Sequence, residues 1–158
     1  MTAATSRVAR LTESDWRVFA GVRLRALADS LGENDSQYKQ EAAFTAANWR
    51  RRLREHAQFA VLIDDRAVGL IGAQLENAET VYLYSLWLDP TARGRGLAQS
   101  LVAAAVDWAR DRHARTVTLR VAADNAVARC VYESLGFTLN PAESPSERGE
   151  IAMTLSVS

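Results

Sequence analysis

The sequence has little of several residue types, and each shortage narrows what the protein can be. It contains a single cysteine, Cys130, so no disulfide can form within the chain, as is typical of a reducing compartment. No apolar run approaches the roughly 18 residues of a membrane helix, and the N-terminus lacks an apolar signal-peptide core. One cysteine and two distant histidines, His56 and His113, make no metal-ligand pattern. We therefore expect a cytoplasmic protein with no metal.

An excess of either charge is also missing. The 19 basic and 19 acidic residues cancel, so no overall field attracts nucleic acid or an anionic membrane. Lysine is nearly absent, because 18 of the basic residues are arginine and the remaining one is Lys39. One arginine cluster, Arg50 to Arg52 with Arg54, falls in a stretch of helix-like spacing. We expect that cluster to be a solvated helix face and expect neither nucleic acid nor membrane as a partner.

The 158 residues, 48% of them hydrophobic, suffice for one substantial core, and we expect a single domain over residues 1–158. Strands are expected over residues 8–11, 59–63, 67–75, 81–88, 116–121 and 151–155, with a short one near Phe137. Helices are expected after residues 12–15 and over residues 44–55, 97–113 and 125–135, with a polar, turn-rich segment over residues 29–40. Antiparallel strands followed by a β-α-β crossover predict a mixed α/β sheet with helices on both faces.

A glycine-bearing turn, Arg93-Gly94-Arg95-Gly96-Leu97-Ala98, leads from one expected strand into the helix over residues 97–113. Backbone N–H groups in such a turn converge on an anion, and the helix N-terminus adds a partial positive charge. Guanidinium groups also match phosphate oxygens, and the first helical turn carries no acidic residue that would compete. The turn therefore favours phosphate binding over the alternative of an ordinary tight loop.

Two stretches in the same order resemble the GCN5-related N-acetyltransferase (GNAT) family. Residues 86–98 are similar to the family's coenzyme A motif, with Arg93, Gly96 and Ala98 at its marked positions. Residues 125–137 are similar to its Asn-x-x-Ala-x-x-x-Tyr-x-x-x-Gly-Phe signature, which is matched here by Asn125, Ala128, Tyr132, Gly136 and Phe137. The resemblance implies a mostly antiparallel central sheet whose central strands splay apart, and acetyl-coenzyme A as the cosubstrate.

The resemblance also implies roles for the matched residues. Backbone N–H groups of the turn would hold the coenzyme pyrophosphate, and these belong to Arg93, Gly94, Arg95, Gly96, Leu97 and Ala98. The segment Leu86-Trp87-Leu88 would contact pantetheine, with Leu88 N–H as the candidate donor to the thioester oxygen. Asn125 would contact the coenzyme, and Tyr132 would protonate the departing thiolate as a neutral primary amine of a small molecule or peptide attacks directly. We expect Cys130 to be a small buried residue and not a nucleophile.

The sequence departs from the family pattern at the general base. Many members carry an acid on the strand before the turn, where this chain has Tyr82, Tyr84 and Ser85. A water route through Tyr84 or Ser85 is our first candidate for removing the amine's proton and Glu76 the second, and no base is assigned. We expect His56 and His113 to be exposed at helix ends.

The resemblance implies that the segment between the first two helices, residues 29–43, lines the acceptor pocket. This segment carries four acids against Lys39, which favours a cationic acceptor by steering. Those acids are Asp29, Glu33, Asp35 and Glu41.

Other functional classes require residues that this sequence lacks at the turn. A Rossmann dinucleotide site would need a third glycine where Gln99 stands, and a P-loop would need Gly-Lys-Ser/Thr after the turn. The alternative that remains is a catalytically inactive acyl-coenzyme A sensor or interaction domain. The missing acid favours that alternative, whereas Tyr132 argues against it. The sequence leaves open the acceptor, the acyl chain and the oligomeric state, including a homodimer through apolar positions near Trp87 or the C-terminal strand.

Overall fold

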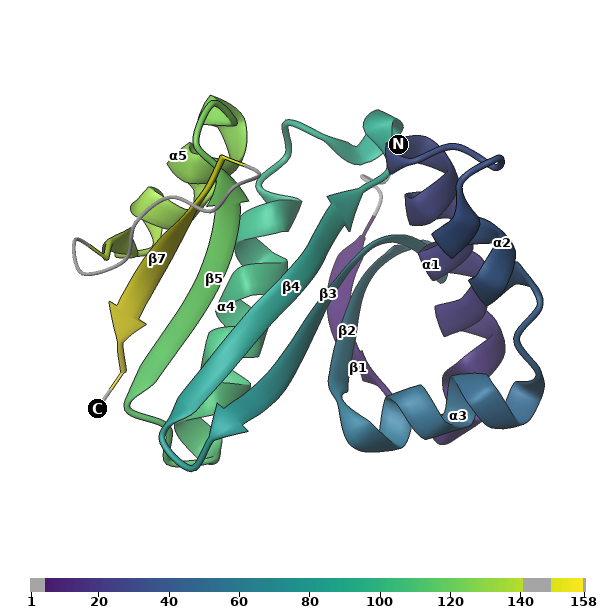
Figure 1. Ribbon diagram of the computed structural model, residues 1–158, viewed down its shortest axis with the longest axis horizontal. Helices are drawn as coiled ribbons and strands as arrows, with labels where there is room; N and C mark the ends of the chain where they lie inside the picture. The colour runs from purple at the N-terminus through teal and green to yellow at the C-terminus, as the bar shows by residue number, and fades with distance from the viewer. Residues whose placement is uncertain (1–4, 141–148, 158) are drawn as a thin grey trace.

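The strands form one seven-stranded sheet in the computed structural model, which describes residues 5–140 and 149–157 (Figure 1). The strands are β1 (Ser6–Leu11), β2 (Ala57–Ile63), β3 (Arg66–Asn77), β4 (Thr80–Leu88), β5 (Thr116–Ala122), β6 (Thr138–Leu139) and β7 (Glu150–Ser156). Their order across the sheet is β1-β2-β3-β4-β5-β7-β6. The β4–β5 pair is parallel and its neighbours are antiparallel, which confirms the predicted mixed, mostly antiparallel sheet.

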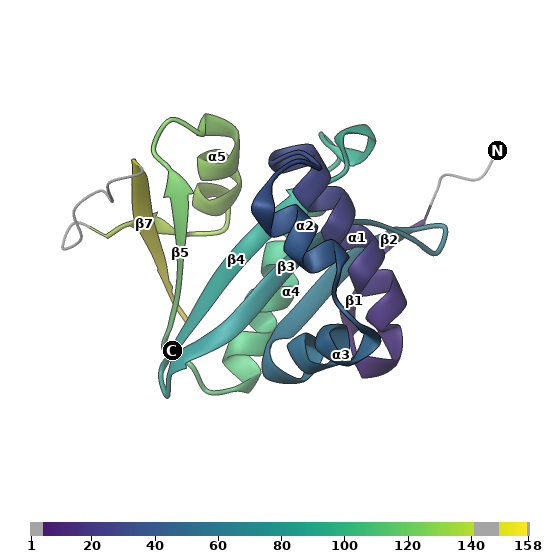
Figure 2. The ribbon, with the colours of Figure 1, turned by 45° about the vertical axis from the view of Figure 1, so that its right-hand side comes forward.

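Helices cover both faces of this sheet. They are α1 (Trp16–Ser30), α2 (Ser36–Ala42), α3 (Ala46–Glu55), α4 (Leu97–Asp111) and α5 (Ala126–Ser134), with short 3-10 turns η1 (Glu13–Asp15) and η2 (Pro90–Ala92). Figure 2 shows α1, α2 and α3 in front of the sheet and α4 behind it. Within the described ranges, no helix is long and apolar enough to cross a membrane.

Each face of the sheet has its own apolar core. Alternate residues of β2 point to opposite faces, so Phe59 joins the core under α4 while Ala60 joins the core under α1 and α3. Leu101 is fully buried in the first core, and Phe19 is nearly so in the second. The two cores hold the strands in place between the helices. They therefore also hold β4, along which the sheet opens.

The sheet opens along β4. Pairing with β5 ends at Leu83 and Leu119, although β4 continues to Leu88. Figure 1 shows the two strands diverging beyond that point. On the other side of β4, Ser85 and Leu86 stand opposite the single residue Ile71, which is a β-bulge. Ser85 has a φ of 57°, in the left-handed region. The predicted splay of the central strands is confirmed.

Two expectations about local structure are wrong. Residues 36–42 form α2 where a polar, turn-rich segment was expected. Asp35 caps that helix by accepting from Gln37 N, and the buried residue on its inner face is the charged Glu41. The helix therefore has no apolar periodicity that sequence analysis would detect. Cys130 is exposed and not buried, because α5 packs through the side that carries Tyr132.

Candidate active site

The turn before α4 is shaped to leave space above its backbone. Gly94 and Gly96 have φ values of 80° and 75°, which side chains with a Cβ rarely adopt. A Cβ at either position would meet no atom within 4 Å. The first helical hydrogen bond runs from Ser100 N to Gly96 O, so the N–H groups of residues 97–99 precede it. These donors point toward open space at the start of a 15-residue helix.

Three other helices of this protein close their own N-termini with a side chain. Asp35, Thr45 and Asn125 cap α2, α3 and α5 by accepting a hydrogen bond from a backbone N–H. Gly96 has no side chain with which to cap α4. An anion bound at the turn would take the place of that missing cap. The geometry fits a phosphate group.

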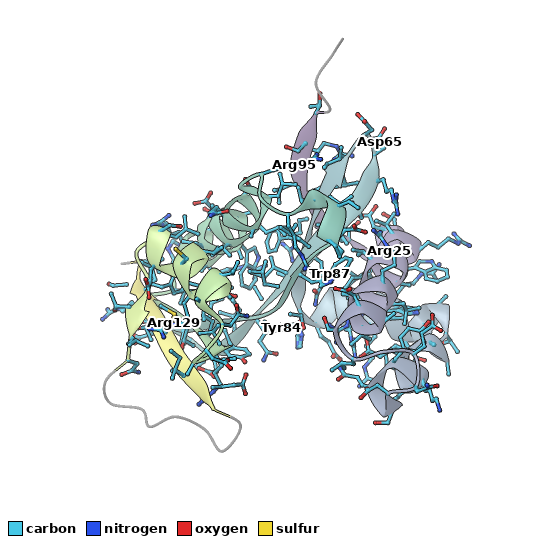
Figure 3. All side chains as sticks on the ribbon, turned by 90° about the horizontal axis from the view of Figure 1, so that it is seen from above. Arg25, Asp65, Tyr84, Trp87, Arg95 and Arg129 are labelled. Carbon is cyan, nitrogen blue, oxygen red and sulfur yellow. The ribbon has the colours of Figure 1, made fainter. Side chains whose placement is uncertain are left out.

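The two arginines of the turn lie differently. Arg93 donates from Nε to Leu88 O at 3.1 Å and from Nη2 to the Asp29 carboxylate at 3.2 Å. Its guanidinium therefore holds the turn against the end of β4. Arg95 is exposed beside the beginning of α4 (Figure 3). Of the two guanidinium groups, that of Arg95 is the one available to an anion.

Beyond Leu83, the edge of β4 that faced β5 is no longer paired with that strand, so its backbone is open there. Asp89 N–H donates to Val68 O at 2.7 Å, so the polar groups of Asp89 face β3. Because successive residues of a strand alternate, those of Leu88 and Leu86 face the opening. Leu88 O already accepts from Arg93, and its N–H points the same way. The predicted pantetheine positions thus lie on the open edge.

Trp87, which lies between them, packs elsewhere. Its side chain, labelled in Figure 3, is buried in the core under α1. Its indole N–H donates to Asp29 Oδ2 at 2.9 Å. The indole is therefore used inside the protein and is not presented to a coenzyme. Leu97 is likewise buried, so its N–H group and not its side chain is the part that faces the turn.

The second predicted motif lies on α5. Asn125 Oδ1 accepts from Ala128 N at 3.1 Å and caps the helix, leaving its amide N–H₂ for other contacts. Tyr132 is buried, with its ring edge-on to Phe137 at 5.8 Å between centroids. Burial raises the pKa of Tyr132 to about 12. The phenol is therefore protonated at neutral pH and able to donate a proton.

A cavity of about 280 Å³ opens on the face of the sheet covered by α1, α2 and α3. It is lined by Phe19, Arg23, Gln37, Arg52, His56, Gln58, Leu70, Tyr84 and Ser85. Tyr84 and Ser85 directly follow Leu83, where pairing with β5 ends. The bulged segment of β4 thus forms a wall of the cavity and continues directly into the open edge.

Tyr84 lies in a hydrogen-bonded chain within this cavity. Its Oη accepts from Gln58 Nε2 at 2.7 Å and lies 2.5 Å from His56 Nδ1. Burial lowers the pKa of His56, so the ring is neutral at pH 7. Burial also raises the pKa of Tyr84, which keeps the phenol protonated. In the neutral tautomer that carries its proton on Nε2, His56 accepts at Nδ1, and the Tyr84 hydroxyl then donates to it while accepting from Gln58.

The expectation that His56 is an exposed helix-end residue is therefore wrong, whereas His113 is exposed as predicted. The sequence shows His56 at the end of α3 but cannot show that it meets a tyrosine 28 positions away. Glu76, the second candidate base, is exposed on β3 and does not line the cavity.

Charged residues form a second cluster at the cavity. Arg23 donates from Nε and Nη2 to Glu41 at 3.1 and 3.3 Å and from Nη1 to Ser85 Oγ at 3.0 Å. Arg52 Nη1 donates to the same carboxylate at 2.6 Å. Burial acts to raise the pKa of Glu41, but the hydrogen bonds and charges of the two arginines outweigh it and the pKa is lowered. Glu41 is therefore a buried anion.

This cluster corrects two expectations. Arg52 belongs to the cavity and not to a solvated face, although Arg50, Arg51 and Arg54 are exposed as predicted. The carboxylate of Glu41 is paired with both Arg23 and Arg52, so it cannot attract a cationic acceptor. Among the acids expected to steer one, Asp29 also binds Trp87 and Arg93, and Asp35 caps α2. Three of the four acids expected to steer a cationic acceptor are thus bound within the protein, which weakens the argument for such an acceptor. In the part of the chain that the structure describes, no cluster of His, Cys, Asp and Glu suits a metal.

Comparison with known sequences gives the same family. The sequence model of the acetyltransferase (GNAT) family matches residues 23–137. A mycothiol acetyltransferase of Beutenbergia cavernae is 31% identical over 134 residues, which cover 80% of this chain and 42% of that protein. An aminoglycoside N(6')-acetyltransferase type 1 of Salmonella typhimurium is 26% identical over 89 residues, or 51% of this chain and 61% of that protein. The chain therefore spans less than two thirds of either relative.

Solved structures share the fold. The PaiA N-acetyltransferase of Thermoplasma acidophilum in complex with coenzyme A superposes with a TM-score of 0.75 at 13% identity, over 97% of this chain and 99% of that one. The ribosomal-protein-S18-alanine N-acetyltransferase of Escherichia coli gives 0.70 at 20% identity, over 98% and 95%. Since the family model covers both motifs and most of the sequence, the chain belongs to the acetyltransferase (GNAT) family.

Proposed function

We propose that this protein transfers an acetyl group from acetyl-coenzyme A directly to a primary amine of a small molecule or peptide. The observation that carries the proposal is that two sites meet on one strand. Beyond the end of its pairing with β5, β4 leaves Leu86 and Leu88 on an open edge and leads into the phosphate-shaped turn, while Tyr84 and Ser85 of the same strand line the cavity. A donor and an acceptor bound in these places would meet where the sheet opens, within one domain.

The coenzyme would bind through backbone groups. N–H groups of the turn, with the exposed Arg95 beside them, are suited to the pyrophosphate. The open backbone of Leu86 and Leu88 is suited to the pantetheine amides, as an added strand would be. Leu88 N–H is our candidate donor to the thioester oxygen, where negative charge develops during attack. Asn125 contributes its remaining amide donors from the start of α5. The coenzyme bound by the PaiA relative of the same fold supports this assignment.

Tyr132, the general acid that the resemblance implies, would assist the departure of the thiolate. Its pKa of about 12 lies above the roughly 8.5 of a thiol, so complete proton transfer to the sulfur is unfavourable and the phenol would act by donating a hydrogen bond to the negative charge that develops there. The phenol contributes while the thioester breaks down, when negative charge develops on the sulfur. Its hydroxyl has no hydrogen-bond partner among residues 5–140 and 149–157, which leaves it available to the sulfur.

The amine would lose its proton through Tyr84 and His56. Tyr84 Oη can accept a proton from the attacking amine while it passes its own to His56 Nδ1, to which it is already hydrogen-bonded. His56 acts through Tyr84 and is a positioning and relay residue, with Gln58 holding the phenol in place. Like the first candidate route from the sequence, this route passes through Tyr84. It adds His56 as the group that takes the proton from Tyr84, a role that the sequence alone did not indicate.

We also infer that the protein acts in the cytoplasm without a nucleic acid or membrane partner. Support comes from a single, exposed cysteine and from equal numbers of acidic and basic residues. A homodimer would use the end of the sheet at β6, where Leu139 is 48% exposed. Sedimentation velocity of the protein with and without coenzyme A measures that oligomeric state.

Two variants test the proposed function together. Gly96→Glu places a carboxylate where the pyrophosphate would bind, so it should abolish the thermal stabilisation of the protein by coenzyme A. Tyr132→Phe removes the proton donor and should lower kcat about 100-fold or more, followed by free thiol release with a panel of primary amines, while coenzyme stabilisation stays near that of the wild type.

The results separate enzyme from sensor. An undiminished melting shift in Gly96→Glu would mean that the anion site lies elsewhere. Unchanged acetyl transfer in Tyr132→Phe would remove that residue from the mechanism. Coenzyme binding with no transfer to any amine by the wild type would favour the inactive acyl-coenzyme A sensor.

A further inference from the structure

We propose that the acceptor is an amino carboxylate, a small molecule bearing both the reacting amine and a carboxylate, and that Arg52 binds its carboxylate in the cavity. This inference rests on the proposed function and specifies the substrate class of the same site. The feature behind it is a cavity wall that contains two guanidinium groups and no acidic side chain.

The charges around the cavity do not cancel. Arg23 and Arg52 line it, and the one carboxylate that both contact, Glu41, is 2% exposed behind them and is absent from the lining. His56 and Tyr84, the other titratable groups on the wall, are neutral at pH 7. One positive charge therefore remains uncompensated and faces the cavity.

The two arginines differ in what they can still bind. Arg23 uses Nε, Nη1 and Nη2 for Glu41 and Ser85, and its side chain is 12% exposed. Arg52 uses Nη1 alone for Glu41 and is 32% exposed. Its Nε and Nη2 have no hydrogen-bond partner among the described residues. Arg23 therefore orients the buried acid, and Arg52 has donors to offer.

The Arg52 guanidinium is also held still. It lies over the ring of Phe44 at 5.1 Å and near that of Trp49 at 6.0 Å. Such a stacked fork is preorganised for two parallel hydrogen bonds to a planar carboxylate, and binding it costs little further side-chain entropy. A single charge on a flexible chain, such as lysine, would not select that geometry.

The same charge suits the chemistry of the amine. A positive wall disfavours an ammonium and favours the neutral amine, which is the form that attacks a thioester. The carboxylate on the acceptor then supplies the attraction that a simple amine would lack. The volume of about 280 Å³ equals about nine water molecules, which fits an amino-acid-sized molecule.

The test uses matched pairs of acceptors. Free leucine, β-alanine and 4-aminobutyrate are each compared with the corresponding carboxamide, and phosphoethanolamine serves as a phosphate-bearing amine. We expect kcat/KM for at least one carboxylate to exceed that of its amide at least tenfold, chiefly through KM. Arg52→Gln should remove most of that preference, and Arg52→Lys should restore it in part. Arg51→Gln is the control, because Arg51 is on the same helix, 68% exposed and paired with Glu55.

A binding measurement keeps the two proposals separate. Thermal stabilisation by the same free amino carboxylates and amides is measured without any coenzyme, in the wild type and in both Arg52 variants. Equal stabilisation or equal kcat/KM for acid and amide, a preference that survives in Arg52→Gln, or a preference for phosphoethanolamine would overturn the carboxylate site. If the acids bind in an Arg52-dependent way and no amine is acetylated, the acceptor site stands and the proposed transferase activity fails.

Discussion

At the scale of single residues, the short contact between Tyr84 and His56 decides how an amine can be deprotonated without an acid on β4. The Tyr84 phenol is flanked by a donor, Gln58 Nε2, and by an acceptor, His56 Nδ1. Only the neutral ring can accept at Nδ1. Burial lowers the His56 pKa from its usual 6.5, so the working form is present at neutral pH. Protonation of His56 would remove the acceptor and leave two donors facing one hydroxyl.

This arrangement predicts an acid limb in the pH dependence of kcat. The rate should rise with pH through a pKa below 6.5 and level off when His56 is neutral. His56→Gln should lower kcat about tenfold or more and remove that limb, because glutamine does not titrate. His113→Asn is the control, since His113 is exposed and asparagine tolerates its φ of 61°. An acid limb that persists unchanged in His56→Gln would assign the proton transfer to another group.

At the scale of elements, the β-bulge of β4 and the strand beneath it position Tyr84. A Cβ at Gly72 of β3 would lie 2.8 Å from the Tyr84 hydroxyl oxygen and closer still to its ring. Because that ring needs the space above a glycine, a methyl group there should push Tyr84 away from His56 and Gln58.

Gly72→Ala should therefore cost about 1–3 kcal/mol of the free energy of unfolding and reduce kcat at the same time. Denaturant titration and thiol release measure the two effects. Gly21→Ala on α1 is the matched control, because no atom lies within 4 Å of its Cβ position and alanine favours a helix by about 0.5–1 kcal/mol. A fully active Gly72→Ala protein would show that Tyr84 need not stay in place.

The elements also show what the sequence could predict. The helices over 97–113 and 125–135 were predicted to within two residues at each end, because apolar spacing marks their buried sides. Helix α2 was missed because its buried residue is Glu41, whose charge is matched only by arginines on two other helices. The cavity is built from such long-range pairs, which leave no local pattern in the sequence.

At the scale of the whole molecule, α1 is tied to the sheet and to α2 by ion pairs at the open edge of β4. Arg25 donates to Asp89 at 2.6 Å and to Ala67 O at 2.7 Å, and Arg23 joins Glu41 to Ser85. Arg23 and Ser85 line the proposed acceptor cavity, so their contacts hold both the cavity and the first helix, whereas the Arg25–Asp89 pair holds the helix. Protonating Asp89 or Glu41 should therefore weaken the fold.

This coupling predicts how stability depends on acid. Hydrogen bonds from Thr91, then from Arg25, lower the pKa of Asp89 from 3.8 to about 2, and the Glu41 pKa is also lowered from 4.5. A carboxylate with a lowered pKa stabilises the folded state above its unfolded pKa and loses that contribution as pH falls to the folded pKa. The free energy of unfolding should therefore drop between about pH 5 and pH 2.

The Asp89→Asn variant should be less stable than the wild type at pH 7, and its free energy of unfolding should fall less between pH 5 and 2.5, as measured by urea titrations. Asp65→Asn, at an 89% exposed side chain, should follow the wild type. An Asp89→Asn protein that loses as much stability as the wild type over that interval would show that Asp89 does not link acid to unfolding.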